Sequence, residues 1–193
     1  MRAIVLAAVV FCSGCLTEMP TAKHRAHTVG ATGRRVLVTN AEGKIVGKVR
    51  LRSTGVRVYG DDLVPIGTVS SSDGIAFHPF PEGAKQTLAK TEADVWEFDQ
   101  SMRIERTQSD WALFDANAQL LGYLNHDGGW SFRGAAGDTW TVNEGKVLDQ
   151  GKVRCEARST GSSEMLLALC VDALPVQARV ALALWMQTQV TPG

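Results

Sequence analysis

The sequence predicts a mainly β fold of the α+β class. We expect an antiparallel β-meander or barrel of about 12 strands around a C-terminal apolar helix, followed by a second short helix. Two observations support this prediction. From residue 35 to 155, apolar and polar residues alternate between turns rich in Gly, Asn and Asp, as in strands with one buried face. Residues 165–186 are apolar on nearly every side, so a helix formed by them must be surrounded, and a long meander that closes can surround it.

The composition is that of an ordinary globular protein, with 45% hydrophobic and 21% charged residues in a chain of 193. Twenty basic and twenty acidic residues cancel, which argues against nucleic acid as a partner, because such binding needs a surplus of Lys and Arg. We expect a leader at 1–14, a flexible tether at 15–34, and one β-rich domain at 35–193 that ends in helices 163–174 and 176–189.

The first residues have the pattern of an export signal. Met1 and Arg2 precede nine apolar residues, a run too short to span a bilayer. Cys12-Ser-Gly-Cys15 follows, and with the leader it resembles the lipobox of bacterial lipoproteins, although that family usually has Leu where Cys12 stands. The resemblance implies that Cys15 is lipidated after cleavage and that the protein is an outer-membrane lipoprotein facing the periplasm or the cell surface. The alternative is an ordinary secretory leader, with Cys15 a free or paired thiol.

The segment 15–34 is polar, rich in Thr and Gly, and without periodicity, which is typical of a flexible tether. Basic residues here outnumber Glu18 and would favour an anionic headgroup surface. They are Lys23, Arg25, Arg34 and the adjacent Arg35. The alternative is a solvated linker without specific lipid contact.

An internal repeat organises the β region around Gly47, Gly67 and Gly122. In each copy, apolar residues stand eleven, nine and one before the glycine and two after it. Each copy predicts a hairpin, and a glycine inside its second strand predicts a bulge or a tight bend. Weaker strand patterns flank the copies, at 74–77, 86–89, 95–99, 102–106, 130–132, 140–142, 146–148 and 152–155. Two prolines and a glycine make 78–83 a loop, in which we expect Phe80 to plug the end of the sheet.

The C-terminal helices have clear limits in the sequence. Ser162 or Ser163 can cap the first helix, and Pro175 either kinks it or begins a second one. We therefore expect a central plug of about ten residues. An amphipathic continuation should follow, with Gln177 and Arg179 facing water.

Two cysteines remain once Cys12 is cleaved off and Cys15 is lipidated. In an oxidising compartment the remaining Cys155 and Cys170 suggest a disulfide between the last strand and the apolar helix. Chain entropy predicts about 3 kcal/mol for a loop of this length. The alternative is two separately buried thiols.

No residue pattern in the chain points to a reaction. Neither a nucleophile motif nor a metal-spaced pair occurs in the β region, and His126-Asp127 and Asp61-Asp62 fall in expected turns. We expect no enzyme, no catalytic residue, no metal and no cofactor. Two functions remain: a lipid-anchored cell-envelope protein with a binding or assembly role and an envelope protein as its partner, or a periplasmic carrier of an apolar ligand in the barrel interior.

The order of the elements over residues 35–174 resembles the tubby-like architecture shared by the scramblase and LURP-one families. In that architecture a closing helix threads a β-barrel. The resemblance implies a barrel closed around residues 165–174. Those families normally end close to the central helix, whereas this chain continues through 176–190.

Overall fold

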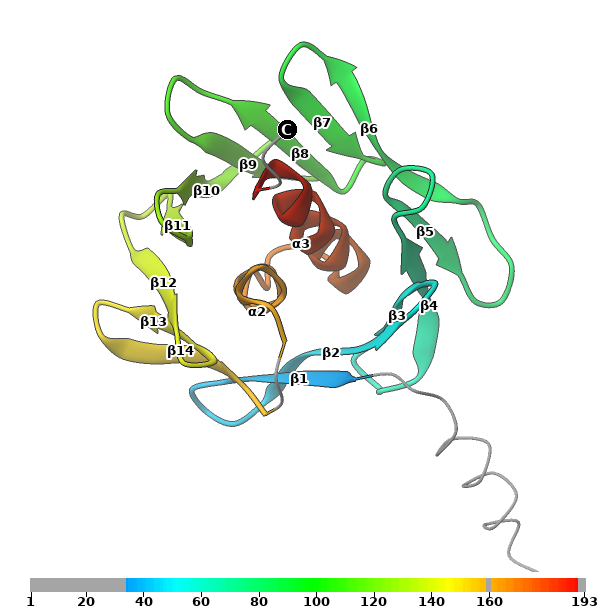
Figure 1. The fold of residues 1–193 in the computed structure, drawn as a ribbon, viewed down its shortest axis with the longest axis horizontal. Helices are drawn as coiled ribbons and strands as arrows, with labels where there is room; N and C mark the ends of the chain where they lie inside the picture. The colour runs from blue at the N-terminus through cyan, green and yellow to red at the C-terminus, as the bar shows by residue number, and fades with distance from the viewer. Residues whose placement is uncertain (1–33, 159–160, 191–193) are drawn as a thin grey trace, which may run out of the picture. The chain divides into compact units, whose positions relative to one another are not determined.

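The structure, a computed structural model, describes residues 34–158 and 161–190. Fourteen antiparallel strands form a closed barrel in chain order, with β14 pairing back onto β1, and both helices lie inside the ring (Figure 1). The mainly β class and the antiparallel barrel are thus confirmed, with fourteen strands in place of about twelve. The predicted leader and the predicted tether, except its last residue Arg34, lie outside the described residues. The elements are β1 Arg35–Asn40, β2 Ile45–Arg52, β3 Gly55–Tyr59, β4 Pro65–Ser70, β5 Ala76–Pro79, β6 Gln86–Glu92, β7 Val95–Phe98, β8 Met102–Arg106, β9 Trp111–Asp115, β10 Leu120–His126, β11 Trp130–Gly134, β12 Thr139–Asn143, β13 Lys146–Asp149, β14 Lys152–Ala157, α2 Ser163–Leu169 and α3 Val176–Val190.

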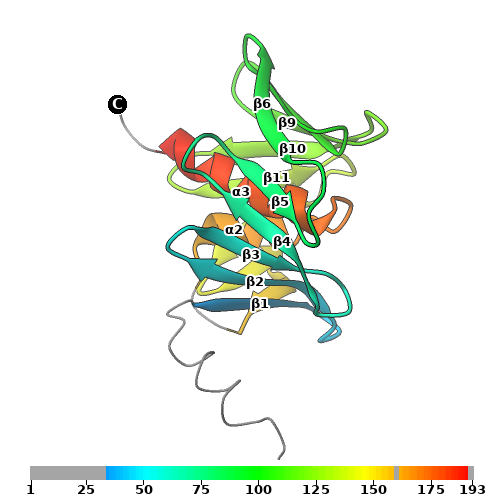
Figure 2. The same cartoon turned by 90° about the vertical axis from the view of Figure 1, so that its right-hand side faces the viewer.

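The three copies of the repeat form three equivalent hairpins, β1–β2, β3–β4 and β9–β10 (Figure 2 shows the first two side by side). In each copy the register shifts at the residue before the glycine, so that Val46, Ile66 and Leu121 are extra residues in their strands. The predicted bulge is therefore present in all three copies. A bulge bends its strand and increases the local twist, which helps a sheet to close.

The glycines of the repeat leave room for neighbouring atoms inside the barrel. A Cβ on Gly67 would overlap the Phe77 ring and lie 2.5 Å from the carbonyl oxygen of His78. A Cβ on Gly47 would lie 3.1 Å from the side chain of Leu169 in α2. The second copy thus accommodates the next strand, and the first accommodates a helix.

Helix α2 begins where the sequence predicts and ends earlier. The Ser162 hydroxyl accepts a hydrogen bond from the Met165 amide at 3.2 Å, so Ser162 is the cap. The helix ends at Leu169 rather than at 174, because the chain turns back there to start α3. Its side chains from Met165 to Leu169 are all buried.

Helix α3 corrects the expectation of an amphipathic continuation. Pro175 precedes its first turn, so of the two alternatives it begins a second helix. The middle of α3, from residue 178 to 186, is buried except at Arg179 and Leu184, which are partly buried. The physical reason is the ring, which encloses two helices side by side, so that α3 has to be apolar on several faces (Figure 1). No helix within the described residues is long and apolar enough to cross a membrane.

Candidate functional site

The interior of the barrel is filled by side chains of the two helices. Leu167, Leu169 and Leu182 are fully buried, and the indole of Trp185 packs against three tryptophans on the wall. The ring centroids of Trp96, Trp111 and Trp130 lie 5.7, 5.0 and 6.0 Å from that of Trp185. These four tryptophans therefore serve core packing.

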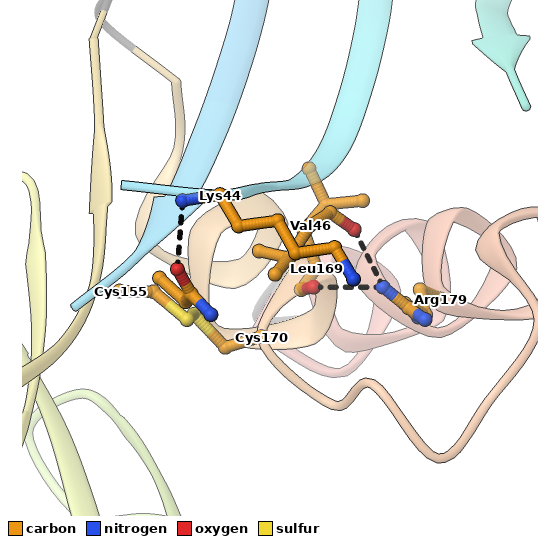
Figure 3. Close-up of a disulfide and its surroundings, with 7 residues drawn as sticks. Lys44, Val46, Cys155, Leu169, Cys170 and Arg179 are labelled. Carbon is orange, nitrogen blue, oxygen red and sulfur yellow. Dashed lines mark hydrogen bonds between the residues drawn. A yellow bond between two sulfur atoms is a disulfide. The ribbon is translucent and has the colours of Figure 1, made fainter. Parts of the chain in front are cut away.

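One end of the filled core is held by a cysteine pair. The Sγ atoms of Cys155 in β14 and Cys170 at the end of α2 lie at disulfide distance, with Cα atoms 6.2 Å apart (Figure 3). Both residues are almost inaccessible to solvent. The pair fits the predicted disulfide between the last strand and the apolar helix.

Beside this pair, Arg179 binds main-chain oxygens instead of facing water as expected. Its Nη1 donates to the carbonyls of Val46 at 2.7 Å and Leu169 at 3.2 Å (Figure 3). Its Nε donates to Leu174 at 2.6 Å and its Nη2 to Asp172 at 3.0 Å. One guanidinium therefore joins the end of α2, the turn that follows and the bulge of the first hairpin.

Burial lowers the pKa of Arg179. The nearby carboxylates of Asp172 and Asp61 favour the charged form and offset part of this shift. An arginine side chain remains protonated at neutral pH even so. The four carbonyl oxygens compensate for the water that the guanidinium has lost. We therefore assign Arg179 a structural role rather than a chemical one.

The other residues with chemical potential are scattered. Cys15 lies outside the described residues. His126 and Asp127 border the β10–β11 turn, where the histidine ring packs on Trp130 with centroids 5.0 Å apart. Within 34–158 and 161–190, no three His, Cys, Asp or Glu side chains form a group that could hold a metal ion.

The outer surface carries two features that stand out from the rest of the barrel. The first is a basic face on β1–β3, made of Arg35, Lys48, Arg52 and Arg57, with the largely buried Arg50 between them. These side chains point outward because their neighbours Val36, Val49, Val56 and Val58 are buried in the core. The strands β1–β5 contain no Asp or Glu, whereas β6–β14 contain seven basic and six acidic residues.

The second feature is an apolar tip, made of Leu63, Val64 and Phe80. Leu63 and Val64 lie in the β3–β4 turn and are 38% and 54% exposed, and Phe80 follows β5 at 45%. The Phe80 amide donates to the carbonyl of Ile66 at 2.7 Å, which brings Phe80 beside that turn. Phe80 therefore does not plug the end of the sheet, because its ring lies outside, with the Arg57 guanidinium 5.5 Å from its centroid.

The repeat shows that the apolar tip is not required by its turn. In all three copies the residue four before the glycine has a positive φ, at 78° in Gly43, 63° in Leu63 and 58° in Ala118. Only the second copy has a large side chain there. The next residue is Val64 in the second copy and Lys44 or Gln119 in the others.

Comparison with known proteins found no match: the chain matches no protein-family model, no curated protein and no solved structure.

The sequence analysis predicted neither of the two surface features. The alternation of buried valines could have revealed the basic face, and alignment of the three turns could have revealed the apolar tip.

Proposed function

We propose that this protein is a lipid-anchored cell-envelope protein that binds a protein partner through its apolar tip. The observation that carries this proposal is the pair Leu63 and Val64, exposed on a turn whose two equivalents present small or polar residues. Exposed apolar side chains that lie together at one place often mark an interaction site. Because side chains of the two helices fill the barrel interior, we expect binding to take place on the outer surface.

The chemistry around the tip indicates what kind of partner it fits. Asp61 and Asp62 precede the exposed pair in the same turn, and Glu82 follows Phe80 in the next loop. An apolar centre with an acidic rim is complementary to a surface with an apolar pocket and basic residues around it. We expect such a partner in the envelope.

The alternative, a periplasmic carrier of an apolar ligand, has less support. A carrier needs an empty lumen of several hundred Å³. Here Leu, Met and Trp side chains from both helices occupy the centre of the barrel.

Site-specific photocross-linking tests the proposed partner surface. A benzophenone amino acid replaces Val64 in the full chain, expressed in cells, and Gln119 is replaced in a matched control at the same position of the third copy. We expect a cross-linked envelope protein of one defined mass at position 64 and not at 119. Mass spectrometry identifies it, and a Leu63→Gly change in the same chain should remove the adduct. Identical adducts at both positions, or an adduct insensitive to Leu63→Gly, would contradict the proposal.

The anchor is tested separately. Metabolic labelling with a palmitate analogue should label the wild-type chain and not the Cys15→Ser variant, because the thiol of Cys15 is the proposed attachment point. An unlabelled wild-type chain would rule out the lipoprotein hypothesis and leave the partner surface untouched.

A further inference from the structure

The cysteine pair forms part of the wall of a cavity. Cys155 and Cys170 are only 3% and 2% exposed to bulk solvent. Both nevertheless line a partly open cavity of about 310 Å³, which lies between the β1–β2 turn, the β13–β14 turn and the end of α2. This volume is at the lower end of the range found for small-molecule sites. A small thiol in the cavity would therefore lie beside the disulfide while the barrel stays folded.

Two cations at this cavity favour thiol chemistry. Lys152 and Arg154 line it from β14, the strand that also carries Cys155. The thiolate is the species that attacks a disulfide, and nearby basic groups lower the pKa of a thiol. The two cations would therefore raise the thiolate fraction of an incoming thiol and stabilise the thiolate that leaves.

A carboxylate at the same cavity lacks a hydrogen-bond partner. The Oδ1 of Asp149 is buried, and no donor within residues 34–158 and 161–190 reaches it. Burial of an unpaired acceptor is costly, so this oxygen points to a donor that the chain does not supply. Glu42 and Asp172 also line the cavity, so the carboxylates together favour a ligand with a protonated amine.

We propose that this cavity is a site for thiol–disulfide exchange between Cys155–Cys170 and a small amino thiol. The amine of the ligand donates to Asp149, and its thiolate attacks one sulfur of the pair. The disulfide bond breaks, the attacked cysteine joins the ligand in a mixed disulfide, and the electron pair of the broken bond leaves on the other cysteine as a thiolate.

A second molecule of the amino thiol completes the exchange. It attacks the ligand sulfur of the mixed disulfide, which gives the oxidised ligand and two protein thiols, and two protons pass through water from the ligand thiols to the protein thiols. The link between β14 and α2 would then depend on the thiols in the surrounding compartment. The inference is independent of the apolar tip and of the lipid anchor, since neither Leu63, Val64, Phe80 nor Cys15 lines the cavity.

Two thiols that differ in one group test the inference. Cysteamine carries a protonated amine where mercaptoethanol carries a hydroxyl. Each is added to the full chain carrying Cys12→Ser and Cys15→Ser, in which the pair holds the remaining cysteines. The protein thiols formed are alkylated at successive times and counted by mass spectrometry. The same measurement in concentrated urea gives the rate of each reagent with the unfolded chain, so the ratio of native to unfolded rates corrects for intrinsic reactivity.

We expect this ratio to be about tenfold higher for cysteamine than for mercaptoethanol, because a charged hydrogen bond to Asp149 contributes to its binding. An amide acceptor forms a hydrogen bond about half as strong, so Asp149→Asn should reduce the preference to about threefold. Asp127→Asn in the β10–β11 turn is the matched control and should leave the preference unchanged within about twofold.

The urea dependence separates attack on the folded protein from attack on unfolded chains. Direct attack should be proportional to thiol concentration and insensitive to urea well below the unfolding transition. A rate that follows the unfolded fraction, equal ratios for the two reagents, or a full preference retained by Asp149→Asn would overturn the inference.

Discussion

The hairpins β1–β2 and β3–β4 have the same backbone geometry, but their bulges and glycines make different contacts. Both have a turn with a positive φ at the same position, a bulge before a glycine, and buried valines on the inner face. In the first hairpin the bulge carbonyl of Val46 accepts from Arg179, and Gly47 leaves space for Leu169. In the second, the bulge carbonyl of Ile66 accepts from the Phe80 amide.

This difference teaches how a repeat can acquire distinct roles without a change of fold. The bulge of the first hairpin contacts Arg179 of α3 and Leu169 of α2, and the turn of this hairpin carries no large apolar side chain. The second contacts only the sheet at the equivalent glycine, and its turn displays Leu63 and Val64 outward. The contacts of each glycine, of Arg179 and of Leu63 can be altered one at a time.

The largest effect is expected for Gly67→Ala. The new methyl group would meet the Phe77 ring and a backbone carbonyl, which cannot move without breaking the β4–β5 pairing. We expect a loss of about 4 kcal/mol in the free energy of unfolding, at the upper end for overpacking, measured by urea denaturation of the full chain.

Gly47→Ala is the matched change in the first hairpin. Its methyl group meets the flexible end of Leu169 at 3.1 Å, so about 1 kcal/mol is expected. Equal losses for the two variants would mean that the glycines serve the bulge alone and that the neighbours do not distinguish the copies.

The next effect is expected for Arg179→Met, which keeps the length of the side chain and removes its donors. Four carbonyl oxygens, including that of Val46, then lose a hydrogen bond in a partly buried place. We expect a loss of about 3 kcal/mol. Gln177→Met in the same helix is the control and should change stability by less than about 0.5 kcal/mol. If the two variants unfold at the same urea concentration, Arg179 does not hold α2 to the first hairpin.

The fold could be predicted from the sequence to the extent that local pattern determines it. Alternating valines, the repeated glycines and the apolar C-terminus were sufficient for an antiparallel barrel around a helix. The prediction of an amphipathic α3 was wrong because one charged residue, Arg179, suggested that one face of this helix is exposed to solvent. Its partners are main-chain carbonyls from β2 and from the residues that follow α2, and no sequence pattern identifies such acceptors.

The surface features depended on register, which the sequence specifies only indirectly. Arg50 and Arg57 are seven residues apart in the chain, and their direct opposition follows from the length of the turn between β2 and β3. The apolar tip is different, because Leu63 and Val64 are visible in an alignment of the repeat. Its exposure could have been predicted if the three turns had been compared.

Removal of the cysteine pair should cost about as much stability as removal of Arg179. The two cysteines close a loop of fifteen residues between β14 and α2, and a disulfide there stabilises by about 3 kcal/mol in the chain-entropy model. Urea denaturation of Cys155→Ser and of the wild type with reductant should give the same reduced stability. A wild-type chain whose stability is unaffected by reductant would show that Arg179 and packing alone hold the end of α2.

The smallest effect, and the only gain, is expected for Leu63→Gly. A leucine at φ 63° carries a steric cost that a glycine does not, as the first hairpin shows with Gly43 in the same place. The variant should be more stable by about 1 kcal/mol. The relief of steric strain at the positive φ exceeds the cost of the larger conformational entropy that a glycine has in the unfolded chain. Ala118→Gly in the third copy is the control, where a smaller gain is expected.

Because the Leu63 side chain is exposed and supports no core contact, a gain in stability together with loss of the position-64 cross-link would separate binding from folding. A loss of stability would instead mean that Leu63 packs on the barrel and that its exposure serves the fold.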